Sequence, residues 1–247
     1  MKSKILTFLA VGLMVSACGG NQTTDSMAVE TEKQSEVTQE EEDTQSSSDD
    51  PTGIISIRKT WAEKPIKVGA GEGKVGIGQL AKAFCQTYPQ CETVNAMGEY
   101  LKTPNNDGEP ISVDGLMYDV EVDQRNGFAR CMMLVETSPF MDACYWNRKN
   151  GHKLFAAYME EAHESGAYAE ILLVFYDYDP ATDVMTPDAD VNAMFEEYMK
   201  NPDDYALRLP QEGKDIIVYN YVYDEENDSA KTSEITFIWN GDTFERK

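Results

Sequence analysis

The chain has 247 residues and a formal net charge of −23, with 44 acidic against 21 basic side chains. Binding to phosphate backbones requires a basic face, so this charge balance argues against DNA or RNA as a partner. It also argues against flat docking on an anionic lipid surface.

The first 17 residues have the layout of a secretory signal peptide. Lys2 and Lys4 precede a short apolar run over residues 5–15, and small residues stand just before Cys18. This layout is typical of exported chains, and the run is shorter than the about 20 apolar residues that span a bilayer. Val15-Ser16-Ala17-Cys18 resembles the lipobox of bacterial lipoproteins.

That resemblance implies cleavage before Cys18, which would carry a diacylglycerol thioether and a further acyl chain such as palmitate. Several acyl chains hold a protein stably in a lipid bilayer, where a single chain is marginal. Gly19 follows in place of an acidic residue, which favours the outer over the inner membrane in a cell with two membranes. We therefore expect residues 1–17 to be removed and the mature protein to be anchored in the cell envelope.

Residues 18–52 are expected to form a disordered acidic tether behind the lipidated cysteine. The stretch 19–51 is rich in Ser, Thr, Gln, Asp and Glu, and contains one lysine and no aromatic residue. It has little apolar area to offset the entropy lost on ordering, and its like charges extend the chain. A calcium- or partner-binding tail is the alternative for the same residues.

Residues 53–247 are expected to form a single globular domain that begins with helices. Residues 77–88 place apolar side chains at helical spacing, and Pro89 ends the pattern. A second short helix is expected over residues 92–101, and a third over residues 191–199.

From Gly115 the pattern changes to strands separated by turns. Asn-Gly, a strong hairpin signal, occurs at 126–127, 150–151 and 240–241. The run 171–176 is apolar on both faces and is expected to lie in the interior of a sheet. The other expected strands are 116–122, 128–135, 140–146, 152–159, 216–223 and 234–239, with a polar loop over 224–231. These elements predict an α+β fold, a mainly antiparallel meander sheet with the N-terminal helices packed against it.

Four further cysteines, Cys85, Cys91, Cys131 and Cys144, are candidates for disulfide bonds because the chain is expected to be exported. If residues 128–135 and 140–146 form a hairpin centred on 137–138, Cys131 and Cys144 lie opposite each other. Cys85 and Cys91 would pair across the end of the first helix. Free buried thiols are the alternative, and neither spacing is that of a metal or redox site.

Several segments resemble an uncharacterised family of exported proteins from Bacteroidetes-type bacteria. The resemblance covers residues 144–154, 175–182, 209–216 and 238–244. The family has no assigned activity, so the resemblance implies the compartment and the fold class and assigns no functional residues.

The glycine-rich segment 69–76 invites comparison with a phosphate-binding loop, whose glycines let backbone N–H groups close on phosphate. The pattern requires Gly five residues before Gly73 and Ser or Thr after Lys74, where this chain has Val68 and Val75. The segment is therefore interpreted as a flexible loop before the first helix.

The remaining polar candidates are also interpreted structurally. Asp177, Asp179 and Asp183 alternate like the start of a calcium loop but lack its glycine and its final glutamate, so we expect a hairpin turn. His152 and His163 lack the partners of a catalytic triad or a zinc site. We therefore expect no metal and no cofactor, and the sequence identifies no catalytic residue.

Tyr219, Tyr221 and Tyr223 alternate along one strand with Val218 and Val222. If the valines face the core, the tyrosines form a stripe toward solvent that could stack on sugars or anchor a partner. The alternative is that a second layer, such as the N-terminal helices, covers them.

Taken together, the sequence predicts a lipid-anchored envelope protein that is not an enzyme and binds a ligand or partner, such as an envelope protein or glycan. Two alternatives remain open. The domain could be an envelope hydrolase or glycan-processing enzyme that uses paired carboxylates, or a purely structural component of the envelope.

Overall fold

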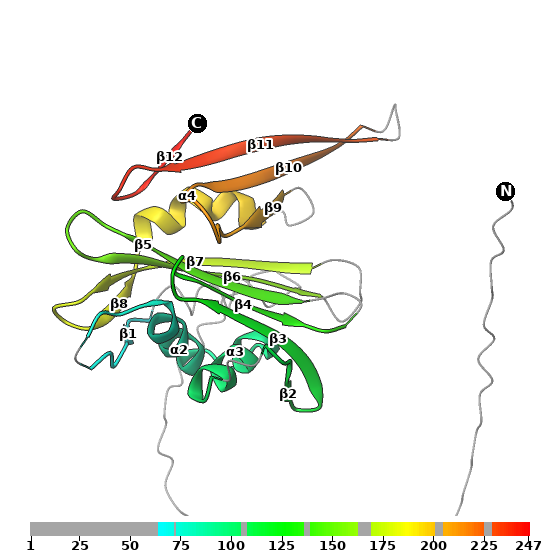
Figure 1. Cartoon of the computed structure of the whole chain (residues 1–247). Helices are drawn as coiled ribbons and strands as arrows, with labels where there is room; N and C mark the ends of the chain where they lie inside the picture. Colours follow the sequence, from blue (N-terminus) through cyan, green and yellow to red (C-terminus); the bar gives the residue numbers. More distant parts are fainter. Residues whose placement is uncertain are drawn as a thin grey trace, which may run out of the picture. The chain divides into compact units, whose positions relative to one another are not determined.

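The computed structural model describes residues 64–71, 73–104, 108–135, 139–162, 169–200, 205–224 and 229–247. Cys18, the expected signal peptide and tether, Glu72 and His163 lie outside these residues. The described chain contains two antiparallel sheets and three helices (Figure 1). The prediction of a mainly antiparallel α+β fold is confirmed.

The larger sheet has eight strands in the order β1-β8-β7-β6-β5-β4-β3-β2. From β2 to β8, neighbours in sequence are neighbours in the sheet, so this part is a meander. Its strands are β1 (Ile66–Lys67), β2 (Ile111–Val113), β3 (Leu116–Asp123), β4 (Phe128–Met133), β5 (Phe140–Asn147), β6 (Lys153–Ala162), β7 (Ala169–Asp179) and β8 (Val184–Pro187).

The smaller sheet has four strands in the order β12-β11-β10-β9. They are β9 (Tyr205–Arg208), β10 (Ile216–Asp224), β11 (Ser229–Trp239) and β12 (Phe244–Arg246). The sequence pattern predicted one sheet, and the structure separates the last strands into a second one. β11 also begins at Ser229, inside the expected polar loop, because its polar first residues pair with β10.

The three helices are α2 (Ile77–Thr87), α3 (Glu92–Lys102) and α4 (Ala189–Lys200). In α2 the side chains of Ile77, Leu80 and Phe84 are fully buried along one stripe, as the helical spacing predicted. Tyr88 forms the C-terminal cap just before Pro89, where the proline prevents further helical hydrogen bonding.

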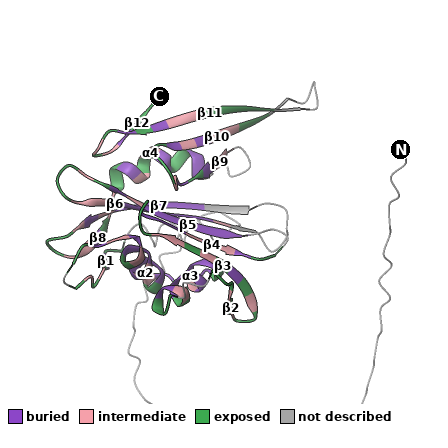
Figure 2. Ribbon diagram, in the orientation of Figure 1, coloured by how far each residue is buried: buried purple, intermediate pink, exposed green. Residues whose placement is uncertain are grey.

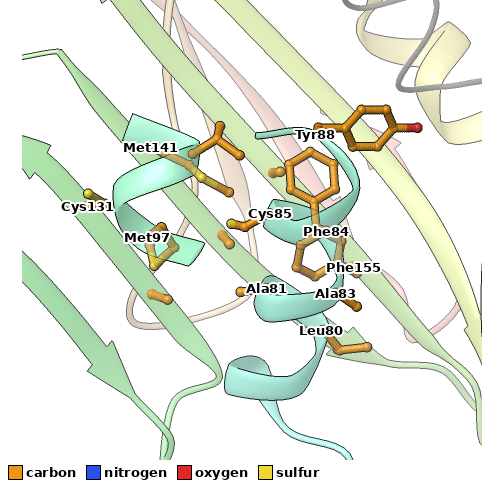
Figure 3. Packing of buried hydrophobic residues seen from close by; sticks show 14 of the residues in the cluster. Leu80, Ala81, Ala83, Phe84, Cys85, Tyr88, Met97, Cys131, Met141 and Phe155 are labelled. Atoms are coloured by element: carbon orange, nitrogen blue, oxygen red, sulfur yellow. The ribbon is translucent and has the colours of Figure 1, made fainter. Parts of the chain in front are cut away.

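The first buried cluster combines α2 and α3 with side chains from one face of the larger sheet. The ring of Phe84 lies 5.6 Å from that of Phe155 in β6 and 6.1 Å from that of Tyr176 in β7, measured between centroids. Figure 3 shows the labelled side chains of α2 gathered with Met97, Met141 and Phe155.

The second buried cluster combines the other face of the larger sheet with α4 and one face of the smaller sheet. Phe195 of α4 is at its centre, with ring centroids 5.0 Å from Phe175 in β7 and 4.4 Å from Phe237 in β11. Trp146 of β5 lies 5.9 Å from Trp239 of β11.

The central strands of the larger sheet are therefore buried on both faces (Figure 2). In β7, Leu172 and Val174 belong to the first cluster, whereas Leu173 and Phe175 belong to the second. This confirms the prediction made from the doubly apolar run 171–176, because side chains alternate between the faces of a strand.

Hairpin turns form at the three predicted Asn-Gly sites. Their glycines, Gly127, Gly151 and Gly241, have φ values of 71°, 88° and 96°, a left-handed conformation that glycine adopts without steric cost. At Gly127 a Cβ atom would lie only 2.8 Å from Cε1 of Tyr145, so the turn also requires the missing side chain.

The predicted pairing of Cys131 with Cys144 is wrong. Cys131 lies opposite Met141, and Cys144 lies opposite Phe128. The partner of Cys131 is thus three positions earlier than expected, and an odd shift of register moves a side chain to the other face of the sheet. Cys131 belongs to the first cluster and Cys144 to the second, and all four cysteines of the domain are free and buried.

Candidate ligand pocket

A pocket of about 850 Å³ lies where four connecting segments meet. One wall is the loop before α2, a second comes from β5, β6 and their hairpin turn, and a third is the β7–β8 turn, while Gln124 of the β3–β4 turn completes the lining. We call it the loop–sheet pocket. Its lining residues are Ala70, Gly71, Gly73, Lys74, Val75, Gly76, Gln124, Tyr145, Asn147, Gly151, Lys153, Tyr178, Pro180 and Asp183.

Asp183 fastens the loop to the sheet. Its carboxylate accepts hydrogen bonds from the backbone N–H groups of Gly69 (3.0 Å) and Ala70 (3.3 Å) and from the Tyr178 hydroxyl (3.1 Å). The Lys67 ammonium lies 3.5 Å from the same carboxylate. The one carboxylate among the described lining residues is therefore engaged by groups of the protein itself.

These contacts also determine whether the Asp183 carboxyl group is ionised. Desolvation acts to raise the pKa of Asp183, but the hydrogen bonds from Ala70, Tyr178 and Gly69 and the charge of Lys67 outweigh it and lower the pKa. Desolvation, followed by the bond to Asp183, raises the pKa of Tyr178 to about 12. At neutral pH the carboxylate is thus ionised and the phenol remains a donor.

The loop exposes its backbone because glycines occupy its left-handed positions. Gly69, Gly71 and Gly73 have φ values of 68°, 66° and 146°. No atom lies within 4 Å of a Cβ built on any of them. Glycine is therefore required here by the backbone conformation and not by lack of space for a side chain. Without side chains, these residues present their peptide groups to the pocket.

Two lysines line the loop–sheet pocket from opposite sources, Lys74 from the loop and Lys153 from β6. The Lys153 ammonium lies 4.1 Å from the ring centroid of Tyr145 and donates a 2.6 Å hydrogen bond to Oδ1 of Asn147. Desolvation, followed by the nearby charge of Lys74, lowers the pKa of Lys153. Within the described residues, neither lysine forms an ion pair with a carboxylate.

His152 and the aspartates on the other face of β7 form a separate network around Arg148. Arg148 donates to the carboxylates of Asp177 and, at 2.5 Å, Asp188. His152 Nδ1 lies 2.7 Å from Asp177, and its Nε2 lies 3.6 Å from Asp179. Asp188 also caps α4 through the Val191 N–H, so the network joins structural elements to one another.

The aspartates that resembled the start of a calcium loop are divided among different tasks. Asp177 belongs to the Arg148 network, Asp179 accepts hydrogen bonds from Ala181 and Thr182 within the turn, and Asp183 anchors the loop. The predicted hairpin turn is confirmed. Across the described residues, no group of three or more His, Cys, Asp or Glu side chains is placed to hold a metal ion.

Another ion pair joins the neighbouring strands β4 and β5 of the larger sheet. Asp142 in β5 has no exposed area and accepts bonds of 2.7 and 2.8 Å from Arg130. Burial raises the pKa of Asp142 despite the arginine. Asp142 is not among the residues that line the loop–sheet pocket.

The tyrosine stripe lies on β10. Val218 is buried in the second cluster, while Tyr219 on the other face is half-buried and Tyr221 is 39% exposed. Val222, expected to face the core, is 53% exposed, and the side chain of Tyr223 is not described. The cluster that contains α2 and α3 includes neither Tyr219 nor Tyr221, so these helices are not the covering layer that the alternative suggested.

The sequence therefore pointed to the glycine loop but missed Lys153, Tyr145 and Asn147. These residues come from two strands of a hairpin, and only the fold brings them to the loop. A basic residue just after an Asn-Gly turn was the signal available for Lys153, and it is a common pattern on exposed hairpins.

No protein-family model matches the chain, and comparison with curated proteins and with solved structures finds no match either. None of the helices among the described residues is long and apolar enough to cross a membrane.

Proposed function

We propose that the chain is a lipid-anchored protein of the cell envelope that binds a small ligand in the loop–sheet pocket. The outer membrane is favoured over the inner membrane as the site of its anchor. The observation that carries the binding role is the pocket of about 850 Å³ where four connecting segments meet. Pockets that hold small molecules measure roughly 300–1,000 Å³ and combine apolar surface with a few oriented polar groups.

The proposal includes the expected packing of the N-terminal helices on the sheet. The glycine loop runs from the Asp183 anchor to Gly76, the residue before α2. Ile77 and Phe84 share a buried cluster with Phe155 and Tyr176 of the sheet, which supports this packing.

Binding is favoured over hydrolysis by paired carboxylates. Such hydrolysis requires two carboxyl groups about 5–9 Å apart across the bond that breaks. Among the described residues that line the pocket, Asp183 alone has a carboxylate, and its oxygen atoms already accept bonds from the loop and Tyr178.

The anchor is tested by acylation of Cys18. Cells that produce the full chain are supplied with radiolabelled palmitate, and the membranes are separated. We expect the label on the wild-type protein in the outer-membrane fraction and its loss, with release from membranes, in Cys18→Ser. A Cys18→Ser chain that stays labelled would contradict lipidation at this residue.

The binding site is tested by filling the pocket. Gln124 is exposed and lines the pocket, so Gln124→Trp should block it without disturbing the core. The control is Arg125→Trp, an exposed neighbour in the same turn that does not line it. The melting temperature of each full chain in detergent is measured with glucose, glucuronate, glucose 6-phosphate, succinate and the dipeptide Ala-Ala.

We expect at least one of these compounds to stabilise the wild type and Arg125→Trp but not Gln124→Trp. Equal stabilisation of all three chains would place binding elsewhere and overturn the proposed site.

A further inference from the structure

The loop–sheet pocket concentrates unpaired positive charge in a strongly acidic protein. The chain has 44 acidic and 21 basic side chains. Several other cations of the described residues contact carboxylates, as in the pairs of Arg130 with Asp142, Lys67 with Asp183 and Lys102 with Glu99. Others, such as Lys82 of α2, form no ion pair with a described residue, but they do not line this pocket. Lys74 and Lys153 form no such pair with a described residue, although both line the same pocket.

Two ammonium groups that face one pocket repel each other, and an anion between them would remove that repulsion. The lowered pKa of Lys153, caused by desolvation and by the charge of Lys74, agrees with this arrangement. The ion-pair partner of Asp183 is Lys67, 3.5 Å away, and its carboxylate forms no ion pair with Lys74 or Lys153.

We infer that the ligand is a small dianion whose charged group lies between the ammonium groups of Lys74 and Lys153. This inference rests on the proposed function and specifies its ligand class. Two unpaired positive charges match a group of charge −2, and lysine binds such groups as a point charge without requiring the planar geometry that arginine needs. A phosphate monoester and a dicarboxylate both have this chemistry.

The remaining lining fits the polar body of such a ligand. The half-buried ring of Tyr145, covered on one side by Lys153, provides an apolar surface, and the amide of Asn147 provides a donor and an acceptor. The glycines at 71 and 73 expose peptide groups along the same pocket.

The test compares ligands that differ in charge. Glucose 6-phosphate is compared with glucose, and succinate with its neutral diamide, on the full acylated chain in detergent. We expect the dianions at about 10 mM to raise the melting temperature by about 3 °C and their neutral counterparts to have no effect. The phosphate and dicarboxylate arms identify which source of negative charge the pocket prefers.

Variants then test whether the two lysines bind the dianion. Lys74→Gln and Lys153→Gln should each weaken the Kd of the preferred dianion about tenfold. Lys82→Gln, which removes the same charge from α2 outside this pocket, should leave the Kd unchanged. Binding should also weaken as salt is raised, because ions screen the lysines.

A readout at Lys153 separates direct contact from a structural effect. In the full chain labelled with ¹⁵N at its lysine side chains, the Nζ signal of Lys153 should report a pKa that rises when the dianion binds, and that of Lys82 should not change. Equal affinity in Lys74→Gln, Lys153→Gln and Lys82→Gln, or no stabilisation of the wild type by either dianion, overturns the inference.

If glucose stabilised the protein as strongly as glucose 6-phosphate, the inference that the ligand is a dianion would also be overturned. If that stabilisation were lost in Gln124→Trp, the pocket would remain the binding site and only its ligand class would change.

Discussion

Arg148 is the residue that ties the two sheets and α4 together at one point. Its side chain contacts Asp177 of β7 and the α4 cap Asp188, and it donates a 2.9 Å hydrogen bond to the carbonyl of Asp242 in the β11–β12 turn. Only 11% of the arginine side chain is exposed. The side chains of its partners Asp177 and Asp188 are 25% and 13% exposed, so water could hydrate their carboxylates only in part if the arginine were removed.

We expect Arg148→Ala to lower the free energy of unfolding by about 3 kcal/mol, because the change leaves two carboxylates without their cation. Urea denaturation followed by circular dichroism measures this. Arg246→Ala, which breaks an exposed pair with Glu197, should cost no more than about 0.5 kcal/mol. Equal costs for the two variants would show that the network does not hold the elements together.

Asp183 makes the attachment of the glycine loop dependent on pH. Because its pKa is lowered in the folded protein, its contribution to stability is complete above the ordinary aspartate pKa of about 3.9 and is lost as the pH falls through the lowered value. Protonation should therefore release the Gly69 and Ala70 amides.

The amide proton shifts of Gly69 and Ala70, measured by NMR between neutral and acidic pH, should follow the titration of Asp183. In Asp183→Asn they should lose this pH dependence. Amide shifts that stay constant in the wild type while the carboxyl titrates would contradict the anchor.

At the residue scale, the sequence indicated one part of the candidate site and not the rest. The glycine loop was evident because Gly recurs in it, but its comparison with phosphate loops failed on spacing. Lys153 and Asp183 are far from the loop in sequence, and only the pairing of β6 with β7 and of β1 with β8 brings them beside it.

At the scale of elements, the register of the β4–β5 hairpin has a chemical consequence. Cys131 and Cys144 belong to clusters on opposite faces of the larger sheet. We expect peptide mapping of the non-reduced protein to find no bridge between them, because a disulfide needs both Cβ atoms on one side. A peptide pair joined through these two cysteines would contradict the register.

The elements that the sequence predicted are those with a strong local signal. The helix over Ile77–Thr87 has a clear stripe, and the Asn-Gly turns mark three hairpins. β1, β2, β8 and β9 have two to four residues each, too few to display alternation. The β4–β5 register was missed because it depends on the geometry of a connection with no such turn signal.

At the scale of the whole described domain, one sheet separates two buried clusters. Val94 of α3 belongs to the first and Val218 of β10 to the second. We expect Val94→Ala and Val218→Ala each to cost about 2 kcal/mol and their double variant to cost the sum within about 0.5 kcal/mol. Urea denaturation of the three chains measures this.

The contrasting pair is Phe195→Leu with Phe237→Leu, whose rings are 4.4 Å apart in the same cluster. Their double variant should depart from additivity by about 0.5 kcal/mol or more. Coupling between Val94 and Val218 of the same size would contradict the separation of the clusters.

The division into two sheets could not be predicted from the pattern of single strands. β10 buries Ile216 and Val218 on one face, and this alternation is the same whether the strand extends the larger sheet or packs across it. The choice depends on long-range contacts, such as those of Phe237 and Trp239 with α4 and β5, which leave no local trace.

The buried thiols can report local unfolding of the protein through their reactivity. Burial raises the pKa of Cys131 to about 12 and also raises the pKa values of Cys85 and Cys144. Since the thiolate is the reactive form, a thiol reagent can modify these residues only when the surrounding structure opens. Cys85 and Cys131 would thus report the opening of the first cluster, and Cys144 that of the second, within one unmodified chain.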